Sequence, residues 1–158
     1  MRSIDSVHVV PILAPVSITS ATNTDVVGLK KYHAAKFLVP CGALAVNLTI
    51  TVLKADDTTP SNETAIAFRY RKSAAVGTDT MGAWATAEST GVVLTGTTDN
   101  GKMVEILVES SELTPVSGTE YPYVMLTLTP ASSSACLVSA VAVLEPRYAQ
   151  AVPPSAVD

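Results

Sequence analysis

The chain has 158 residues, of which 47% are hydrophobic and 15% charged, which is the composition of one folded domain with a sizeable core. Its formal net charge is −4, and its 10 Lys and Arg residues are spread along the chain, so it lacks the clustered positive charge that nucleic-acid binding requires. Its apolar runs are too short to cross a bilayer, and Pro11 and Pro15 interrupt the first of them, unlike a secretory signal. We therefore expect neither nucleic acid nor a membrane as a partner.

The N-terminal half is expected to supply several strands. Residues 7–16 are extended and carry prolines, which favours an edge strand or an arm that lies on a neighbouring subunit. A short strand at residues 35–39 ends before Pro40, and residues 45–54 show the clearest alternation of apolar and polar side chains. The inward positions of this last strand are Val46, Leu48, Ile50 and Val52.

Further strands are predicted in the middle of the chain, at residues 65–71, 92–95 and 103–110. The polar segment between the last two contains Asn100 followed by Gly101. Both residue types tolerate a positive φ, so this dipeptide predicts a β-hairpin that joins the flanking strands.

Residues 121–148 are the stretch around which the other strands are expected to be arranged. Apolar and more polar side chains alternate from Val124 to Leu128, which is the period of a half-buried strand. The small-residue segment 130–134 has turn chemistry, and residues 136–144 are apolar on both faces except at Ser139. We interpret this stretch as a central hairpin whose second strand is covered on both sides.

These elements amount to about eight short strands, and no segment of useful length has a helical period. The sequence therefore predicts an all-β fold, an antiparallel β-sandwich of jelly-roll-like type. No repeat or linker divides the chain, so residues 1–158 are expected to form a single domain. Residues 1–16 are expected to form an extended N-terminal arm or edge strand, and residues 146–158 an extended C-terminal tail.

The sequence carries no pattern for catalysis, for a cofactor or for a metal ion, so we expect a protein that is not an enzyme. His8 and His33 have no second ligand at metal spacing. Glu105 and Glu109 share a strand face roughly 13 Å apart, whereas the two carboxylates of a glycosidase lie at most about 9.5 Å apart.

The two cysteines, Cys41 and Cys136, are far apart in the sequence. Disulfides persist in oxidising compartments, and nothing at the N-terminus has the form of a secretory signal. We therefore expect two buried free thiols in a protein that is assembled in a reducing cytoplasm. A disulfide between them stays open as an alternative.

Two features each have two interpretations. Arg69, Arg71 and Lys72 form a basic face on one strand, which suits either an interface with an acidic neighbour or a solvated strand face. Trp84, the only tryptophan, suits either the core or an anchor at a protein contact.

Several segments that follow one another along the chain have a familiar order. They are VHVVPILAPVSI at 7–18, GLKKYHAAKFLVPCGAL at 28–44, NLTITVLKADD at 47–57, YPYVMLTLTP at 121–130 and LVSAVAVLEPRYAQAVPP at 137–154. This order resembles that of small β-proteins of tailed bacteriophage virions, the capsid decoration or cement class. The resemblance is strongest over residues 138–148, and the loop at 71–90 departs from the pattern.

The resemblance implies a non-enzymatic virion protein, without a cofactor, that binds the major capsid protein on the exterior of a phage head and stabilises the capsid. It also implies assembly in the bacterial cytoplasm and a homo-oligomer, either a trimer or a dimer. Extended termini at 7–16 and 147–158 would reach neighbouring subunits by strand addition. The expected interface residues are Val9, Val10, Ile12, Leu13, Arg69, Arg71, Lys72, Arg147, Tyr148 and Val152.

Two other functions remain open from the sequence. The first is a different virion component, such as a tail, neck or baseplate subunit. The second is a carbohydrate-binding β-sandwich, because jelly rolls host many lectins. Sugar sites usually expose aromatic rings, and this chain has 1 Trp and 2 Phe.

Overall fold

The computed structural model describes residues 7–148 and 153–157. Within them the chain forms strands, one short 3-10 helix (Ser110–Glu112) and no α-helix. The strands are β1 (His8–Ile18), β2 (Thr22–Asn23), β3 (Val27–Gly28), β4 (Tyr32–Leu44), β5 (Leu48–Ala55), β6 (Glu63–Ile66), β7 (Phe68–Lys72), β8 (Ala85–Ala87), β9 (Val92–Leu94), β10 (Met103–Glu109), β11 (Tyr123–Pro130) and β12 (Cys136–Pro146).

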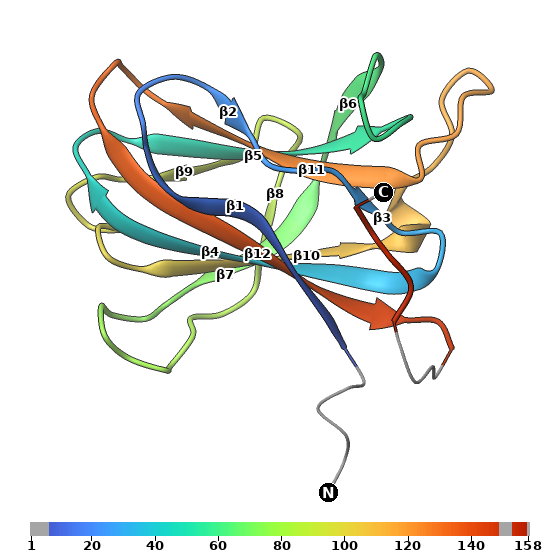
Figure 1. Cartoon of the computed structure of the whole chain (residues 1–158). Helices are drawn as coiled ribbons and strands as arrows, with labels where there is room; N and C mark the ends of the chain where they lie inside the picture. Colours follow the sequence, from blue (N-terminus) through green and yellow to red (C-terminus); the bar gives the residue numbers. More distant parts are fainter. Residues whose placement is uncertain (1–6, 149–152, 158) are drawn as a thin grey trace, which may run out of the picture.

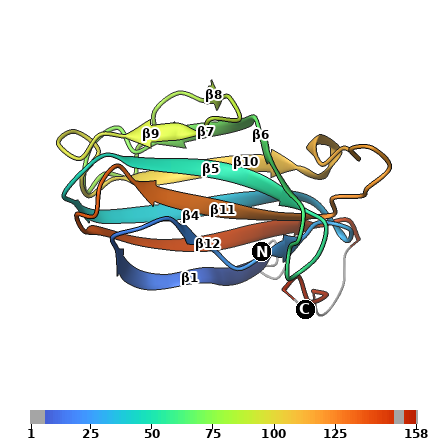
Figure 2. The same ribbon diagram turned by 90° about the horizontal axis from the view of Figure 1, so that it is seen from above.

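Two antiparallel sheets face each other as a sandwich. Sheet A has the order β1-β12-β4-β10-β7-β8, and sheet B has the order β2-β11-β5-β6, with β3 also paired to β11 and β9 to β5. In Figure 1, β5 and β11 lie in the upper layer and β4 and β10 in the lower layer. Seen from above, β1 and β8 lie at opposite margins, as the strand order requires (Figure 2).

The core lies between the two sheets because side chains alternate along each strand. On β4, for example, Phe37 and Val39 are fully buried while Leu38 between them is only half-buried. The largest fully buried side chains are Tyr32, Phe37, Phe68, Ile12, Leu29, Leu48, Ile50, Leu94, Ile106, Met125, Leu126 and Leu128. All of them except Met125 belong to one core to which both sheets contribute, and Met125 packs with Val26 and Ala55 in a small separate cluster.

The predicted fold class is confirmed. Eight of the strands have four or more residues, and the other four have two or three. The chain passes repeatedly from one sheet to the other, which gives the jelly-roll-like wiring. The inward positions predicted at Leu48, Ile50 and Val52 are all fully buried.

The interpretation of residues 121–148 as a hairpin is wrong. β11 pairs with β2, β3 and β5 in sheet B, whereas β12 pairs with β1 and β4 in sheet A. The turn at 131–135 therefore carries the chain across the sandwich. Each strand has an apolar face, and the sandwich buries these two faces against each other through the core instead of placing them side by side.

The hairpin predicted at Asn100 and Gly101 is a crossing of the same kind. Gly101 has a φ of +73°, as the turn requires, but β9 belongs to sheet B and β10 to sheet A. The side-chain oxygen of Asn100 instead accepts a hydrogen bond from the Leu44 N–H at 3.2 Å. The single strand predicted at 65–71 is also divided, at Ala67, into β6 of sheet B and β7 of sheet A.

β12 is covered on one face only, which corrects the prediction of a strand covered on both. Its inner side chains, such as Val138 and Ala142, are 1% and 0% exposed. On its outer face Leu137 is 43% exposed. The apolar outward positions of β12, Leu137, Val141 and Val143, therefore form an accessible apolar surface.

Cys41 and Cys136 are free and buried, as predicted. Burial raises the pKa of the Cys41 thiol to about 12, with smaller contributions from Cys136 and Asp99. The thiol is therefore protonated and unreactive at neutral pH.

The N-terminal segment takes one of its two predicted forms, the edge strand, whereas the described part of the C-terminal tail does not extend away from the domain. Residues 8–18 form β1, an edge strand of sheet A. In the tail, the Gly28 N–H donates to the Ala156 carbonyl at 2.7 Å, and Ala156 is 5% exposed and packs in the main core. The described tail residues, 153–157, therefore fold back onto their own domain. The remaining terminal residues lie outside the described part of the chain.

Candidate interaction surface

The side of sheet A that points away from sheet B, called the outer face here, is broad and poor in charge. One row of cross-strand partners on it consists of Val9, Val143, Lys36, Leu107 and Arg69, on β1, β12, β4, β10 and β7. We call it the Val9 row. Val9 is 57% exposed, although it is a large apolar side chain on a regular strand.

The next row along the strands is formed by Pro11, Val141, Leu38, Glu105 and Arg71. We call it the Leu38 row. On β1, β12 and β4, every position of the two rows except one carries an apolar side chain. Contiguous apolar surface of this kind on a folded domain is typical of a protein interface.

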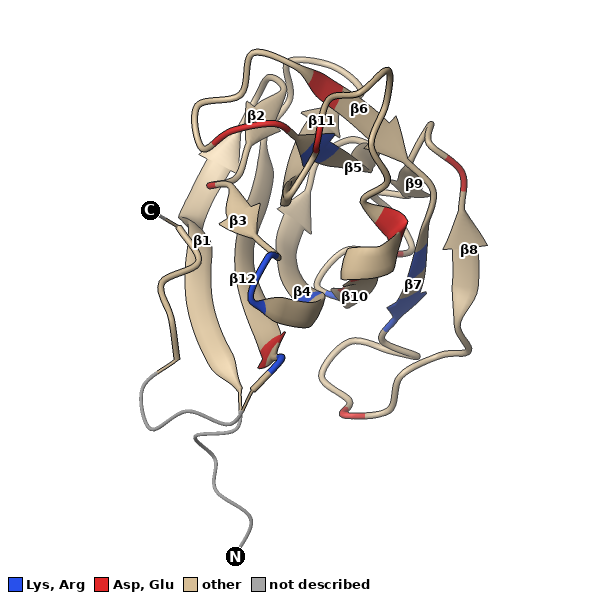
Figure 3. Cartoon of the chain, turned by 90° about the vertical axis from the view of Figure 1, so that its right-hand side faces the viewer, with Lys and Arg blue, Asp and Glu red and all other residues tan. Residues whose placement is uncertain are grey.

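The outer face becomes charged towards β7 and β8. The Arg71 Nε donates to the Glu105 Oε2 at 2.6 Å. The guanidinium carbons of Arg69 and Arg71 lie 5.3 and 4.7 Å from the centre of the Trp84 ring. Trp84 is thus half-buried on the outer face and not in the core. Figure 3 shows basic residues on β7, on a ribbon that is mostly uncharged.

Lys72 does not share this face. It pairs with the inward-facing Val104, and its Nζ lies 2.7 Å from the Asp99 Oδ2, while the Lys102 Nζ lies 3.4 Å from Oδ1. Burial alone would raise the pKa of Asp99. Hydrogen bonds from Lys72 and from the Thr95 N–H, together with Lys102, nevertheless hold it below its usual value. Lys72 is therefore part of an internal ion-pair cluster.

The structure divides the predicted interface residues. Those on the outer face are Val9, Arg69 and Arg71. Val10 and Ile12 are core residues, at 7% and 2% exposure, and Leu13 packs against the core. Because β1 alternates, a continuous apolar run on it cannot all face a partner. Val152 lies outside the described residues.

Sequence reasoning missed most of the apolar side chains of the outer face. They are Leu38, Leu107, Leu137, Val141 and Val143. The signal that identifies those on β12 is its lack of polar side chains, which was interpreted as burial on both sides. Those on β4 and β10 occupy the outward positions of strands that alternate only weakly.

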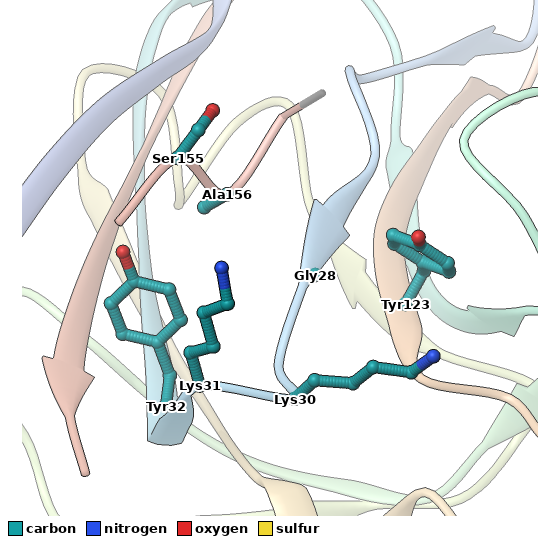
Figure 4. A pocket seen from close by; sticks show the side chains of 7 residues that line it. All are labelled: Gly28, Lys30, Lys31, Tyr32, Tyr123, Ser155 and Ala156. Carbon is teal, nitrogen blue, oxygen red and sulfur yellow. The ribbon is translucent and has the colours of Figure 1, made fainter. Parts of the chain in front are cut away.

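A second region lies where the turn after β3 meets the C-terminal tail. The hydroxyl of Tyr32, which is fully buried, donates to the Pro154 carbonyl and accepts from the His8 Nδ1 at 2.7 Å. Figure 4 shows Lys31 and Tyr32 pointing towards the tail segment that holds Ser155. These side chains line a shallow hollow of about 150 Å³.

The other two predicted interface residues lie at the end of β12. The Arg147 Nε donates to the Tyr32 carbonyl at 3.1 Å, and its Nη2 donates to the Ser110 Oγ at 3.0 Å. Arg147 thus fixes the end of β12 to its own domain. Tyr148, by contrast, is 74% exposed.

No group of three or more His, Cys, Asp or Glu in residues 7–148 and 153–157 is placed to hold a metal ion. In the same part of the chain, no helix is long and apolar enough to cross a membrane. What the outer face of sheet A can do chemically is to bury apolar surface against another protein.

No family model and no curated protein matches the chain. Among solved structures it is similar to the SPBc2 prophage-derived protein YomS, at 11% identity and a TM-score of 0.44, over 90% of this chain and 97% of that one. It is also similar to the CBM22-1–GH10 modules of Clostridium thermocellum endo-1,4-beta-D-xylanase 10B, at 12% identity and 0.34, over 91% and 30%. A third likeness is to T=1 particles derived from infectious bursal virus, at 15% identity and 0.25, over 89% and 39%. None of these likenesses assigns a function.

Proposed function

We propose that the chain is a non-enzymatic structural protein of a phage virion that binds the major capsid protein on the exterior of the head and stabilises the capsid. The observation that carries the proposal is the outer face of sheet A, whose Val9 and Leu38 rows leave apolar side chains accessible on three adjacent strands. A face of this kind is buried when a protein assembles, against another copy of the chain or against a different subunit. The sequence resemblance to decoration proteins indicates that this assembly takes place on a phage head.

The charge of the chain supports an exterior position. A protein with a net charge of −4 is repelled by packaged DNA, which favours the outside of the head over its interior. Many symmetry-related copies on one head also make modest individual contacts sufficient, because multivalent attachment raises the effective affinity.

The experiment is the copy number of this protein in purified particles, relative to the major capsid protein, by quantitative mass spectrometry. We expect near-stoichiometric amounts, and the purified protein should rebind heads from which it has been stripped. A few copies per particle would instead indicate a tail, neck or baseplate subunit. Complete absence from particles would contradict any virion role.

The carbohydrate-binding alternative gains no support from the position of the tryptophan. The Trp84 ring lies against Arg69 and Arg71, so it is not a free platform for a sugar ring. A glycan array tests this alternative directly, and we expect no binding. Specific binding to one glycan class would bring it forward.

A further inference from the structure

We propose that two copies of this chain associate through the outer face of sheet A and form a two-fold symmetric, face-to-face dimer. This inference rests on the proposed function in one respect only, which is that the outer face is a contact within an assembly. The occupant of the face is a second copy, because the face is complementary to itself in apolar pattern and in charge. The head is then contacted by surfaces that the dimer leaves free.

The β1 edge of sheet A, which borders the apolar part of the outer face, is a poor alternative contact. β1 contains Pro11 and Pro15, which have no N–H to donate, and its pairing with β12 shifts register between Pro11 and Leu13 and again between Leu13 and Val16. Prolines and irregular pairing are features that keep edge strands from adding further strands. The apolar surface therefore has to be covered face to face.

A two-fold axis parallel to the strands, between β12 and β4, matches the apolar positions. It places Leu38 opposite the partner's Val141, and each of these contacts occurs twice. It also places Leu107 opposite the partner's Val9, because β10 then faces β1. Sheets that pack face to face keep their strands within about 30° of each other at a separation of about 10 Å, which this arrangement allows.

The same axis matches the charges. Lys36 would lie over the partner's Val143, with its ammonium beside the partner's Glu145, which is the next outward residue on β12. In the described residues no carboxylate lies within ion-pair distance of Lys36, and no cation within that distance of Glu145. A two-fold symmetric contact would form two equivalent ion pairs, because Lys36 of each copy would lie beside Glu145 of the other.

The size of the face is sufficient. The strands from β1 to β10 are about 4.8 Å apart, and outward rows are about 6.7 Å apart, so four strands and four rows cover roughly 500 Å² in projection. Interfaces below the standard size of about 800 Å² per partner occur in weak and transient complexes, so a face of this size suits a dimer of micromolar affinity.

The test is the molar mass in solution by size-exclusion chromatography with light scattering, from about 5 µM to about 500 µM, which brackets a Kd of tens of micromolar. The wild-type chain of 16.4 kDa should show twice that mass at the upper concentrations. Val9→Asp should weaken the dimer by about tenfold or more, because it places a charge in the apolar contact. Val9 is 57% exposed, so this substitution leaves the fold intact.

Val93→Asp is the matched control, because Val93 is 52% exposed but lies on β9 of sheet B. It should dimerise like the wild type. Lys36→Glu and Glu145→Lys should each weaken the dimer, and the double variant should recover it. A wild type that is monomeric at the highest concentration, a dimer unaffected by Val9→Asp, or a double variant that fails to recover would each overturn the inference.

The outcomes also separate this inference from the proposed function. If the wild type dimerises through this face but is absent from particles, the dimer stands and the virion role fails. If Val9→Asp is monomeric and the protein still coats heads at the wild-type level, the dimer stands as a property separate from head binding. If the wild type coats heads but stays monomeric in solution at every concentration, the virion role stands and the dimer is overturned.

Discussion

Arg71 and Glu105 form an ion pair across β7 and β10, with the Arg71 Nε 2.6 Å from the Glu105 Oε2, on the face of sheet A that points away from the core. The side chain of Glu105 is only 11% exposed, and the guanidinium of Arg71 that pairs with it also lies 4.7 Å from the centre of the Trp84 ring. A carboxylate on the outside of a sheet is therefore desolvated almost as far as one in the interior. Its partner cation becomes necessary for stability.

Substituting either member of this pair should lower the free energy of unfolding. Substituting both should lower it by less than the sum of the two single losses. Arg71→Ala leaves Glu105 desolvated without a cation, and we expect it to lower the free energy of unfolding by about 2 kcal/mol. Glu105→Ala should cost a similar amount. The double variant should show a coupling energy of about 1 kcal/mol or more in urea unfolding. Strict additivity would show that the pair is an ordinary exposed contact.

Lys54 is expected to behave differently, because its charge has no carboxylate partner in the described residues. It is 4% exposed, its Nζ donates to the Thr114 carbonyl at 2.6 Å, and it lies 5.1 Å from the centre of the Tyr121 ring. Lys54→Met keeps the volume and removes a buried charge, so the free energy of unfolding should change by less than about 1 kcal/mol.

The effect of Lys54→Met should instead be local. The loop at 113–121 loses the hydrogen bond that fixes it to β5, so its amides should exchange faster in hydrogen-exchange mass spectrometry. Lys54→Ala serves as the comparison, because it also leaves a cavity and should cost about 2 kcal/mol more than the methionine variant. A large global loss for Lys54→Met would show that the charge itself stabilises the fold.

Asp99 should make stability depend on acid pH. Its pKa is held below the usual value in the folded chain despite burial, by Lys72, by the Thr95 N–H and by Lys102. A lowered pKa contributes stability that is fully present above the unfolded pKa of about 3.9, and that is lost as the pH falls through the lower folded value. Asp99→Asn should therefore flatten the acid limb of the stability curve.

The control for Asp99→Asn is Asp79→Asn, at an exposed aspartate. At pH 7 the Asp99 variant should lose about 2 kcal/mol, because Lys72 and Lys102 are left without their carboxylate. The Asp79 variant should keep the wild-type free energy of unfolding at pH 7, because its side chain is exposed. An acid limb that is unchanged by Asp99→Asn would show that other carboxylates carry the pH dependence.

The C-terminal tail provides a further test, because the Tyr32 hydroxyl forms hydrogen bonds both to Pro154 in the tail and to His8 at the start of β1. In Tyr32→Phe the hydrogen bonds from the hydroxyl to the Pro154 carbonyl and from the His8 Nδ1 are both lost. We expect a loss of about 1–2 kcal/mol and faster proteolysis after residue 148. Tyr148→Phe, at a side chain that is 74% exposed, is the control and should change neither. Unaltered proteolysis of Tyr32→Phe would show that the core contact of Ala156 alone holds the tail.

The local structure was largely predictable from the sequence, because a period of two residues identifies strands and their inward positions. Ile50 and Val52, for example, are placed correctly in the core by this means. The period does not say which sheet a strand joins. Both turns that were interpreted as hairpins, at Gly101 and at 131–135, are crossings between sheets, and this depends on how all the strands share one core.

The outer face was predictable only in part for a related reason. An outward valine such as Val143 looks the same in sequence as one covered by another layer, because both sit in an apolar run. The ion pairs of Arg71 and Lys72 were also hidden, since Glu105 and Asp99 lie far from them in the chain. Neighbouring residues of a strand point to opposite faces, so one predicted basic face became two separate clusters.

Substituting Gly91 by alanine tests how tightly β9 packs against β5. It has a φ of +90°, and a Cβ there would lie 2.5 Å from the Ile50 carbonyl oxygen, a backbone atom that cannot rotate away. Gly118 has a similar φ of +84°, but a Cβ there would meet nothing within 4 Å. Gly118→Ala should therefore cost about 1 kcal/mol, which is the penalty for the left-handed conformation alone.

Gly91→Ala should cost about 3 kcal/mol or more in urea unfolding, because it adds a steric contact to the same conformational penalty. Relieving that contact requires β9 to move away from β5, which would expose Val92 and Leu94, now 5% and 0% exposed. The amide of Val92 should then lose its protection from hydrogen exchange. Equal costs for the two alanine variants would show that β9 shifts freely, and that its contact with β5 adds little to the stability of the sandwich.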